Sequence, residues 1–586
     1  MKRIFIYLLI SITLLCLIQP SVSSASPVPT ILDAGTGRDN NLLKERIYIH
    51  TDREIYIAGE YLFFKVYLYD EGEKKLSLNS KFAYILITNR DKQITQLCLP
   101  ITGGIGYGSL SLPDTLRTGP YQVIAYTNWM RNFGESCFFR KQLLIVNRFD
   151  ENLTSVTQAV TYGNEWKQKQ EKSTGLKIST ARISYHQHEK VILNLSLQGS
   201  RNANVSISVV EKPPDNINHT DRLKAFSASD TINTLMNISR KDDLKMCNYL
   251  LEDKGYIISG YVQNPLSRAG ILVRLSTPDT TDNLMYSTTN ESGRFFFQLN
   301  DFYYNKDLYI SIPDQIKEPE SDLILEDKYV FHNDHNLTDT TTFNQYVPFI
   351  KKCQTIASIN RAYNIQPVRN VPGSARHSVS RSISGKPDYK ILLADYVPLK
   401  DFYEIVRETL PYVRLRKNKN NYEVEILDRE NKIFMKNPAV FLNGMLINNI
   451  DNMVSFGSDK IRRIETVCHT RVSGSMVFNG ILSVFTSPDV KNNLFFDKHS
   501  MHLPPISLIN HSYYTNPDYS DPEKKINRYP DFRQLLYWNP SLDLSGNQNI
   551  HAEFYTSDSK GTYIIKVEGI ASDGNPMSCE ANFDVR

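Results

Sequence analysis

The chain has 586 residues, about four times a typical domain of roughly 150 residues, so we expect roughly three to five folded units. Hydrophobic residues make up 41% of it and charged residues 22%, which is the composition of a globular protein and excludes a largely disordered chain. The 67 basic and 63 acidic residues leave a net charge of only +4, which gives no electrostatic support for nucleic-acid binding. The 34 tyrosines and 27 phenylalanines favour strands.

Residues 1–25 are typical of a secretory signal peptide. Two basic residues precede an apolar run over residues 4–18, and Ser23 and Ala25 are the small residues expected before a cleavage site. The run has 15 residues, fewer than the roughly 20 needed to cross a bilayer, so a retained anchor is the less favoured alternative. Lipidation of Cys16 is also less favoured, because a large leucine precedes it. We expect an exported protein in the periplasm or at the outer membrane of a Gram-negative bacterium, with no transmembrane segment in the mature chain.

The six cysteines that remain after the signal peptide are scattered singly, with no CxxC pair and no metal-ligand spacing. They are Cys98, Cys137, Cys247, Cys353, Cys468 and Cys579. Cys98 and Cys137 fall in the same predicted domain. The sequence leaves two alternatives: a disulfide between these two cysteines, or two unpaired thiols.

Short β-rich runs separated by turns recur over residues 45–148, as in an antiparallel β-sandwich. This region has a Thr-Asp, a Tyr, a Gly-Glu, a later Leu-Pro and a Gly-x-Tyr, at Thr51, Asp52, Tyr56, Gly59, Glu60, Leu112, Pro113, Gly119 and Tyr121. The pattern resembles the second macroglobulin (MG2) domain of the α2-macroglobulin family. Members of that family carry an internal thioester within Cys-Gly-Glu-Gln. None of the seven cysteines has that context, so covalent trapping of proteases is not expected.

The same spacing returns downstream and predicts a second, related sandwich over residues 176–254. Thr180, Arg182, Tyr185, Glu189 and Val191 repeat the spacing of Thr51, Arg53, Tyr56, Glu60 and Leu62. Tyr56 and Tyr185 should therefore occupy equivalent positions in two related domains. The polar stretch 216–251 is interpreted as an insertion or connector.

Residues 255–335 resemble the carboxypeptidase regulatory-like domain, a small β-sandwich. The resemblance rests on strands that begin at Gly260, after Gly270 and after Gly293. In that family the module is an accessory fold without catalytic residues of its own.

A helix followed by a basic flexible linker is expected over residues 336–391. Between Arg361 and Pro387 the chain has no acidic residue, and its basic residues are Arg361, Arg369, Arg376, Arg381 and Lys386. A solvated linker is favoured over contact with an anionic surface such as lipopolysaccharide.

Residues 392–488 resemble the plug domain of TonB-dependent outer-membrane receptors. The region has an amphipathic helix over Leu399 to Leu410, a Gly turn at Asn443 and Gly444, a short helix ending in residues 461–465, and a closing strand over residues 480–486. A receptor barrel needs roughly 200 further residues or more, and only 98 follow position 488. Self-contained transport is therefore not expected. Residues 489–515 are interpreted as a linker and residues 516–586 as a C-terminal β-sandwich, in which Gly561 and Tyr563 echo Gly119 and Tyr121.

Three patterns suggest chemistry, and each has a simpler structural explanation. His186 and Glu189 form an HxxE pair, but they fall on a predicted turn and no partner histidine follows at metal spacing. His332, Asp334 and His335 form a small loop cluster without a second ligand group. The glycine-rich run contains Gly103, Gly104, Gly106 and Gly108, but no Lys-Ser/Thr and no helix follow it, as a phosphate-binding loop requires.

The fold class expected is mainly β: tandem immunoglobulin-like or macroglobulin-like sandwiches with one α+β plug-like domain. Residues 26–44 and 149–175 are the remaining predicted linkers. No catalytic, cofactor-binding or metal-binding residues are assigned, and no cofactor is expected. The function expected is that of a non-enzymatic cell-envelope interaction protein that presents the plug-like domain to an outer-membrane β-barrel or another envelope protein. The alternatives are a glycan-binding or nutrient-uptake accessory protein and a hydrolase with an unrecognised site.

Overall fold

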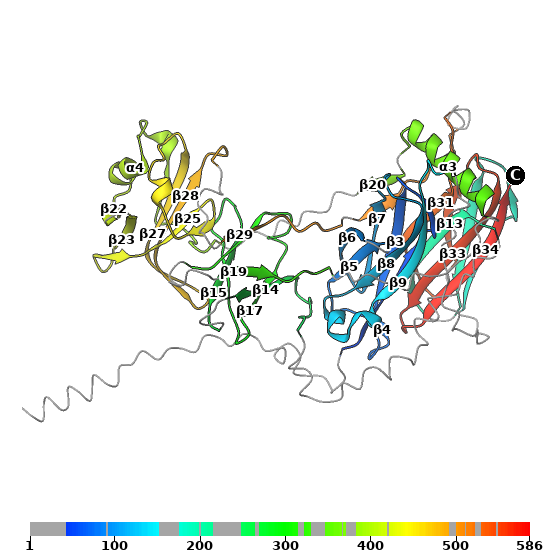
Figure 1. Cartoon of the computed structure of the whole chain (residues 1–586), viewed down its shortest axis with the longest axis horizontal. Helices are drawn as coiled ribbons and strands as arrows, with labels where there is room; N and C mark the ends of the chain where they lie inside the picture. Colours follow the sequence, from blue (N-terminus) through cyan, green and yellow to red (C-terminus); the bar gives the residue numbers. More distant parts are fainter. Residues whose placement is uncertain are drawn as a thin grey trace, which may run out of the picture.

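The computed structural model describes most of the chain after the predicted signal peptide. The described residues are 43–89, 92–151, 175–198, 201–214, 248–263, 269–313, 322–329, 346–365, 367–370, 382–418, 421–490, 500–509, 511–521, 529–546 and 549–586. The signal peptide, most of the polar stretch 216–251 and the cluster of His332, Asp334 and His335 lie outside them. Figure 1 shows two blocks, a base of two β-sandwiches and an arm that ends in the domain carrying α4. The prediction of a mainly β fold with several sandwiches is confirmed.

The first sandwich spans residues 45–146 and has two facing sheets. One sheet contains β1 (Glu45–Thr51), β3 (Tyr61–Asp70), β4 (Lys75–Leu76) and β7 (Ile105–Ser111). The other has the order β2 (Ile55–Ile57), β9 (Phe139–Val146), β8 (Gly119–Tyr126), β5 (Phe82–Thr88) and β6 (Gln93–Pro100). Two 3-10 turns, η2 (Trp129–Phe133) and η3 (Glu135–Cys137), lie between β8 and β9. Apolar side chains from both sheets form the core, as the alternation in the sequence predicts.

The second sandwich repeats this arrangement, except that its described residues form no counterpart of β4. Its smaller sheet has the order β10 (Leu176–Thr180), β12 (Lys190–Leu197) and β32 (Asn549–Tyr555). Its larger sheet has the order β11 (Ser184–Tyr185), β34 (Pro576–Val585), β33 (Gly561–Ala571), β13 (Ala203–Glu211) and β31 (Leu535–Leu544). The short strand β11 pairs in parallel with β34, as β2 does with β9. The predicted equivalence of Tyr56 and Tyr185 is confirmed by this common strand order.

The prediction of a separate C-terminal sandwich over residues 516–586 is wrong. Its strands β31–β34 complete the sandwich that β10–β13 begin, and β13 pairs with both β31 and β33. Each half alone would leave apolar faces open to water, and together they enclose one core. The boundary predicted at residue 254 is therefore also wrong. Residues 212–534 are inserted between β13 and β31, at the position where β5 and β6 of the first sandwich are joined by a turn beginning at Asn89.

The third domain, expected over residues 255–335, is a small sandwich of two sheets. One has the order β17 (Arg294–Leu299), β14 (Tyr256–Gln263) and β19 (Asp322–Leu325). The other has the order β16 (Met285–Thr288), β15 (Leu272–Ser276), β18 (Leu308–Ser311) and β29 (Ser500–Leu503). The strand β29 comes from the predicted linker 489–515, so part of that linker is an ordered edge strand.

The α+β domain has a five-stranded sheet, a three-stranded sheet and one α-helix. The large sheet has the order β21 (Tyr389–Leu392), β27 (Ile461–Ser473), β28 (Met476–Thr486), β25 (Ala439–Leu442) and β26 (Met445–Ile447). The small sheet has the order β22 (Val413–Asn418), β23 (Asn421–Asp428) and β24 (Ile433–Lys436). The other elements are α4 (Phe402–Thr409), η8 (Leu393–Asp395) and η9 (Asp451–Met453).

Two sequence predictions for this domain have different outcomes. The helix α4 forms as expected, beginning after Asp401, whose carboxylate accepts a hydrogen bond from Glu404 N at 2.9 Å. The short helix predicted to end at residues 461–465 is wrong, because these residues begin β27. A β-bulge between Ile461 and Arg463 changes the local spacing, so that Ile461 and Ile464 are buried three residues apart, as in a helix.

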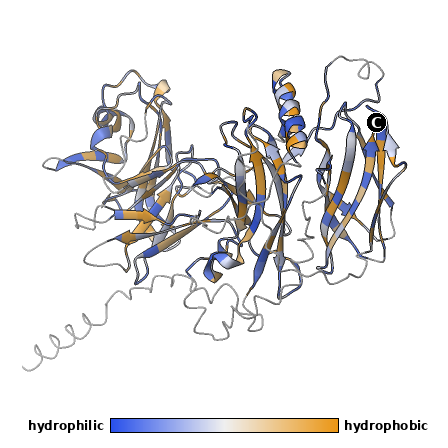
Figure 2. Cartoon of the chain, turned by 45° about the vertical axis from the view of Figure 1, so that its right-hand side comes forward, coloured by the Kyte–Doolittle hydropathy of each residue, from blue (hydrophilic) through white to orange (hydrophobic). Residues whose placement is uncertain are grey.

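Three elements tie the insertion back to the base. The helix α3 (Val347–Ala362) packs its buried residues Ile350 and Cys353 against β2 and β9, and Figure 2 shows it between the two sandwiches. The strands β20 (Val368–Asn370) and β30 (Ser512–Tyr514) pair with each other, and Ser512 Oγ of β30 donates to Ser109 Oγ of β7 at 2.7 Å. The linkers predicted at 336–391 and 489–515 are therefore partly ordered.

Candidate functional site at the junction of the sandwiches

A shared turn motif shapes one end of each sandwich. In the first, Arg53 N lies 3.4 Å from the Tyr56 hydroxyl and the Arg53 guanidinium lies 2.8 Å from a carboxylate oxygen of Glu60. Glu60 also accepts a hydrogen bond from Ile57 N at 2.7 Å. The residue spacing found in the sequence therefore encodes one turn, closed by an Arg-Glu pair.

The second sandwich repeats these contacts, and they explain the HxxE pair. Arg182 N donates to the Tyr185 hydroxyl at 3.0 Å, and the Glu189 carboxylate accepts from His186 N at 2.7 Å while pairing with the Arg182 guanidinium. Glu189 therefore stabilises the turn, and the backbone of His186, not its ring, makes the contact.

The two sandwiches meet through polar side chains that are buried. The Tyr67 hydroxyl donates to Glu568 O at 2.8 Å and lies 3.0 Å from Ser206 Oγ. Ser206 Oγ is also 2.7 Å from His50 Nδ1, and Ser208 Oγ donates to Asp52 O at 2.6 Å. Because β3 and β1 contribute from one side and β13 and β33 from the other, these bonds define how the sandwiches pack together.

Burial shifts the protonation of two groups at this junction. Desolvation lowers the pKa of His50 well below its ordinary 6.5, and the positive charges of Lys141, Lys566 and Lys65 lower it further. Desolvation also lowers the pKa of Lys65 well below its ordinary value, which Asp543 partly opposes. His50 is therefore neutral at pH 7, and an uncompensated charge on Lys65 would be costly.

Lys65 is linked to the protein surface through two side chains. It is fully buried, contacts Asn204 Oδ1 and lies 4.3 Å above the ring of Tyr67. Asn204 Nδ2 in turn donates to Asp543 Oδ1 at 2.7 Å. This Lys65–Asn204–Asp543 relay ends at an exposed carboxylate.

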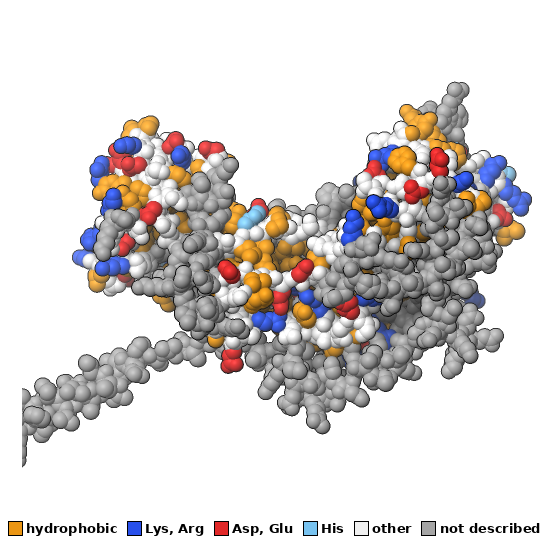
Figure 3. Space-filling model, in the orientation of Figure 1, with side chains coloured by type: hydrophobic (Ala, Val, Ile, Leu, Met, Phe, Trp, Pro, Cys, Tyr) orange, Lys and Arg blue, Asp and Glu red, His pale blue; other side chains and the backbone are white. Residues whose placement is uncertain are grey.

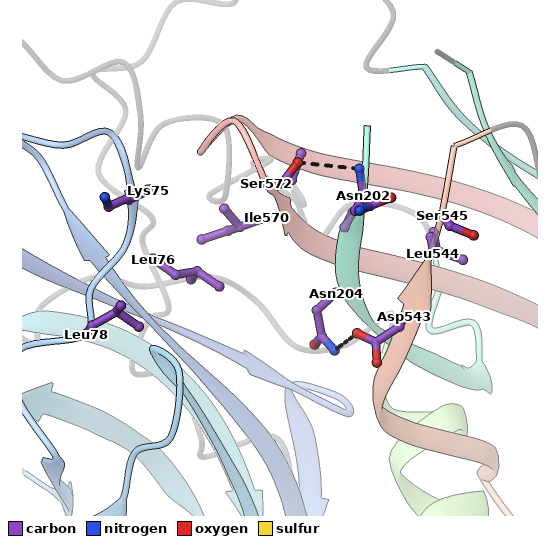
Figure 4. A pocket seen from close by; sticks show the side chains of 12 residues that line it. Lys75, Leu76, Leu78, Asn202, Asn204, Asp543, Leu544, Ser545, Ile570 and Ser572 are labelled. Atoms are coloured by element: carbon purple, nitrogen blue, oxygen red, sulfur yellow. Dashed lines mark hydrogen bonds between the residues drawn. The ribbon is translucent and has the colours of Figure 1, made fainter. Parts of the chain in front are cut away.

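That carboxylate lies in a cleft of about 610 Å³ between the two sandwiches (Figure 4). Leu76 and Leu78 line it from the first sandwich, and they face Ile570 and Asn204 of the second. The complete lining is Lys75, Leu76, Leu78, Asn202, Ala203, Asn204, Asp543, Leu544, Ser545, Ile570, Ala571 and Ser572. The cleft thus combines an aliphatic wall with amide, hydroxyl and carboxylate groups.

Close backbone contact holds the rim of this cleft. Gly574, with a φ of +79°, lies so near the first sandwich that a Cβ atom there would be 1.6 Å from Lys74 O. Glycine is therefore required at this turn for the two sandwiches to approach each other.

The arm exposes apolar side chains, some of which gather at the outer end of the α+β domain in Figure 3. Four of them lie within residues 392–403, and Val397 is 75% exposed. The exposed apolar set of the α+β domain is Leu392, Tyr396, Val397, Tyr403, Ile433, Val472 and Val477. A segment such as 392–403, which exposes several apolar side chains close together in the chain, is a candidate interaction surface.

The structure does not bring the remaining sequence candidates together. Gly103 and Gly104 form the turn between β6 and β7, and Gly106 and Gly108 lie within β7, which pairs with β3. Cys98 and Cys137, whose pairing the sequence left open, are both free thiols, as are Cys353 and Cys468.

The described part of the chain holds no group of three or more His, Cys, Asp or Glu residues placed to bind a metal ion. Within that same part, none of the helices has the length and apolar character needed to cross a membrane. Sequence reasoning missed Lys65, Asn204 and Asp543, because their meeting depends on the packing of two domains.

Comparison with known proteins gives only distant structural similarity. No protein-family profile matches the chain, and no curated protein matches it. Similar solved structures include alpha-2-macroglobulin from Salmonella reacted with methylamine, at 10% identity over 92% of this chain and 23% of that one, with a TM-score of 0.15. The native conformation of alpha-2-macroglobulin from Escherichia coli matches at 8% identity over 92% of this chain and 40% of that one, with a TM-score of 0.23. The chain therefore spans less than half the length of these two proteins, and similarity at this level carries no argument about activity.

Proposed function

We propose that this chain is a non-enzymatic interaction protein of the cell envelope. The two related sandwiches form its base, and the inserted arm presents the α+β domain to an outer-membrane β-barrel partner. Export and the class of partner rest on the signal-peptide pattern and on the resemblance of residues 392–488 to receptor plug domains. The observation that carries the proposal is the insertion of residues 212–534 into one turn of the second sandwich.

The way the insertion is attached supports presentation of a domain. The chain leaves the base after β13 and returns to it at β31, and these two strands pair with each other. On its return it crosses the first sandwich, where Ile509 N donates to Cys98 O at 3.0 Å. Both ends of the arm are therefore fixed to the same base, which limits how far the arm can swing.

Contacts within the arm are close enough to make it one unit. Asp279 N donates to Asn443 O and Asn283 N donates to Gly444 O, both at 2.9 Å. The buried carboxylate of Asp282 accepts a hydrogen bond from Ser483 Oγ at 2.6 Å. The Asn443-Gly444 turn predicted from the sequence is thus one of the contacts between the α+β domain and the third domain.

The test is co-purification from crosslinked outer membranes with the full-length protein and two surface variants. Val397→Asp should abolish recovery of the barrel protein, because a charge replaces an exposed apolar side chain of the proposed surface. Ile183→Asp is the matched control, since Ile183 is 83% exposed but lies in the second sandwich. Equal recovery of the barrel protein with both variants would contradict the proposal.

A further inference from the structure

The cleft at the sandwich junction has a charge arrangement that the interaction proposal does not use. The Asp543 carboxylate stands at one side of it, and one of its oxygens is occupied by Asn204 Nδ2 at 2.7 Å. Asn204 Nδ2 also lies 2.9 Å from Ser541 Oγ, and its Oδ1 contacts the buried Lys65. Asn204 is therefore held by three partners, and it keeps Asp543 oriented in the cleft.

The other charges near the cleft are paired with one another. Lys75 Nζ lies 3.1 Å from a carboxylate oxygen of Glu73, and Arg201 pairs with Asp573 at 3.1 Å beside the rim. Asp543 also acts on Lys65 through its charge, but the two side chains form no direct ion pair among the described contacts, and Asn204 occupies only Oδ1 of Asp543, so the second oxygen can contact a ligand. A cationic ligand can therefore bind Asp543 without breaking an ion pair of the protein.

The other side chains of the lining determine which kind of chain the ligand can carry behind its charged group. Leu76 and Ile570 extend toward each other across the cleft (Figure 4), and Leu78 is 61% exposed at its mouth. The lining contains no aromatic ring on which a sugar or a nucleobase could stack. An unbranched aliphatic chain fits between these side chains, and the volume of about 610 Å³ is within the usual range for small-molecule sites.

We propose that this cleft binds a primary ammonium group carried at the end of an aliphatic chain. The ammonium contacts Asp543, and the methylene groups lie between Leu76 and Ile570. This chemistry has two sources: a free aliphatic diamine, or the side chain of a lysine in a partner polypeptide. The proposal is independent of the arm and of its partner.

Calorimetric titration of the full chain tests the site with four probes: 1,5-diaminopentane, 1-pentanol, a blocked peptide with one lysine, and the same peptide with norleucine. We expect the diamine or the lysine peptide to bind, and the pentanol and norleucine probes to bind at least tenfold more weakly. Binding by the diamine alone assigns a free amine, and binding by the peptide alone assigns a lysine side chain. Equal affinity of the charged and neutral probes, or no binding of either amine, would overturn the proposal.

Two variants locate the binding in this cleft. Asp543→Asn should weaken amine binding at least tenfold, while Asp573→Asn, at the rim but outside the lining, should leave it unchanged. If Asp543→Asn lowers stability, Leu78→Lys provides the second test, because Leu78 is exposed and a lysine there would compete for Asp543. Unchanged affinity in Leu78→Lys would place the binding elsewhere and refute the assignment.

Discussion

Replacing Phe583 by Ala should destabilise two segments of the chain that are far apart in sequence. Phe583 is 2% exposed, and its ring lies 5.6 Å from Tyr185, 5.7 Å from Tyr563 and 6.1 Å from Phe554. Truncation of a buried phenylalanine costs about 3–5 kcal/mol. Since domain stabilities are about 5–15 kcal/mol, this is a large fraction of the free energy of unfolding of the second sandwich.

Hydrogen exchange followed by mass spectrometry gives the decisive measurement. In Phe583→Ala, peptides from 176–211 and from 549–586 should lose protection together, because both segments build one core. Phe297→Ala is the control: it removes an equally buried ring from the third domain and should leave both segments protected. If 549–586 lost protection while 176–211 kept it, the two segments would be separate domains and the reasoning would be refuted.

Three further predictions concern other parts of the fold. Phe402→Ala should cost about 3–5 kcal/mol and unfold the α+β domain before its neighbours, because Phe402 is fully buried; a single concerted melting transition in calorimetry would contradict this. The folded-state pKa of His50 lies below 6.5, so the unfolded chain binds the proton first, and the free energy of unfolding should fall by up to about 1.4 kcal/mol per pH unit below pH 6.5. Denaturant titrations should show that His50→Gln removes this part of the pH dependence, and an unchanged slope would argue against it. Gly574→Ala should lower the melting temperature more than Gly134→Ala, since both have a positive φ but only Gly574 would clash, with Lys74 O; equal effects would mean that the rim contact is unimportant.

Local patterns in the sequence were enough to predict several elements of the structure. The spacing from Thr51 to Glu60 returns from Thr180 to Glu189 because each set closes its own turn through contacts between residues a few positions apart. The amphipathic helix α4 and the turn at Asn443 and Gly444 were predictable for the same reason. Such features depend on short-range geometry, which a sequence displays directly.

One available signal was interpreted wrongly. Gly561 and Tyr563 echo Gly119 and Tyr121, and the structure shows the physical basis: Tyr121 and Tyr563 each donate to the backbone oxygen four residues earlier, at 2.9 and 3.1 Å. This pair of positions marks β8 in the first sandwich and its counterpart β33 in the second, whose first four strands lie before the insertion. The echo therefore indicated the missing half of the second repeat rather than a separate C-terminal sandwich.

Only the tertiary structure decided which strands share a core. The strands β13 and β31 are neighbours in one sheet although residues 212–534 separate them, and no local pattern specifies a pairing at that distance. The same holds for Lys65, Asn204 and Asp543, which come from three strands and meet only when two domains pack. The sequence by itself thus determined the β-rich repeats and their turns, because these depend on neighbouring residues. The closure of the second sandwich and the cleft at its junction depend on long-range packing, which only the folded chain displays.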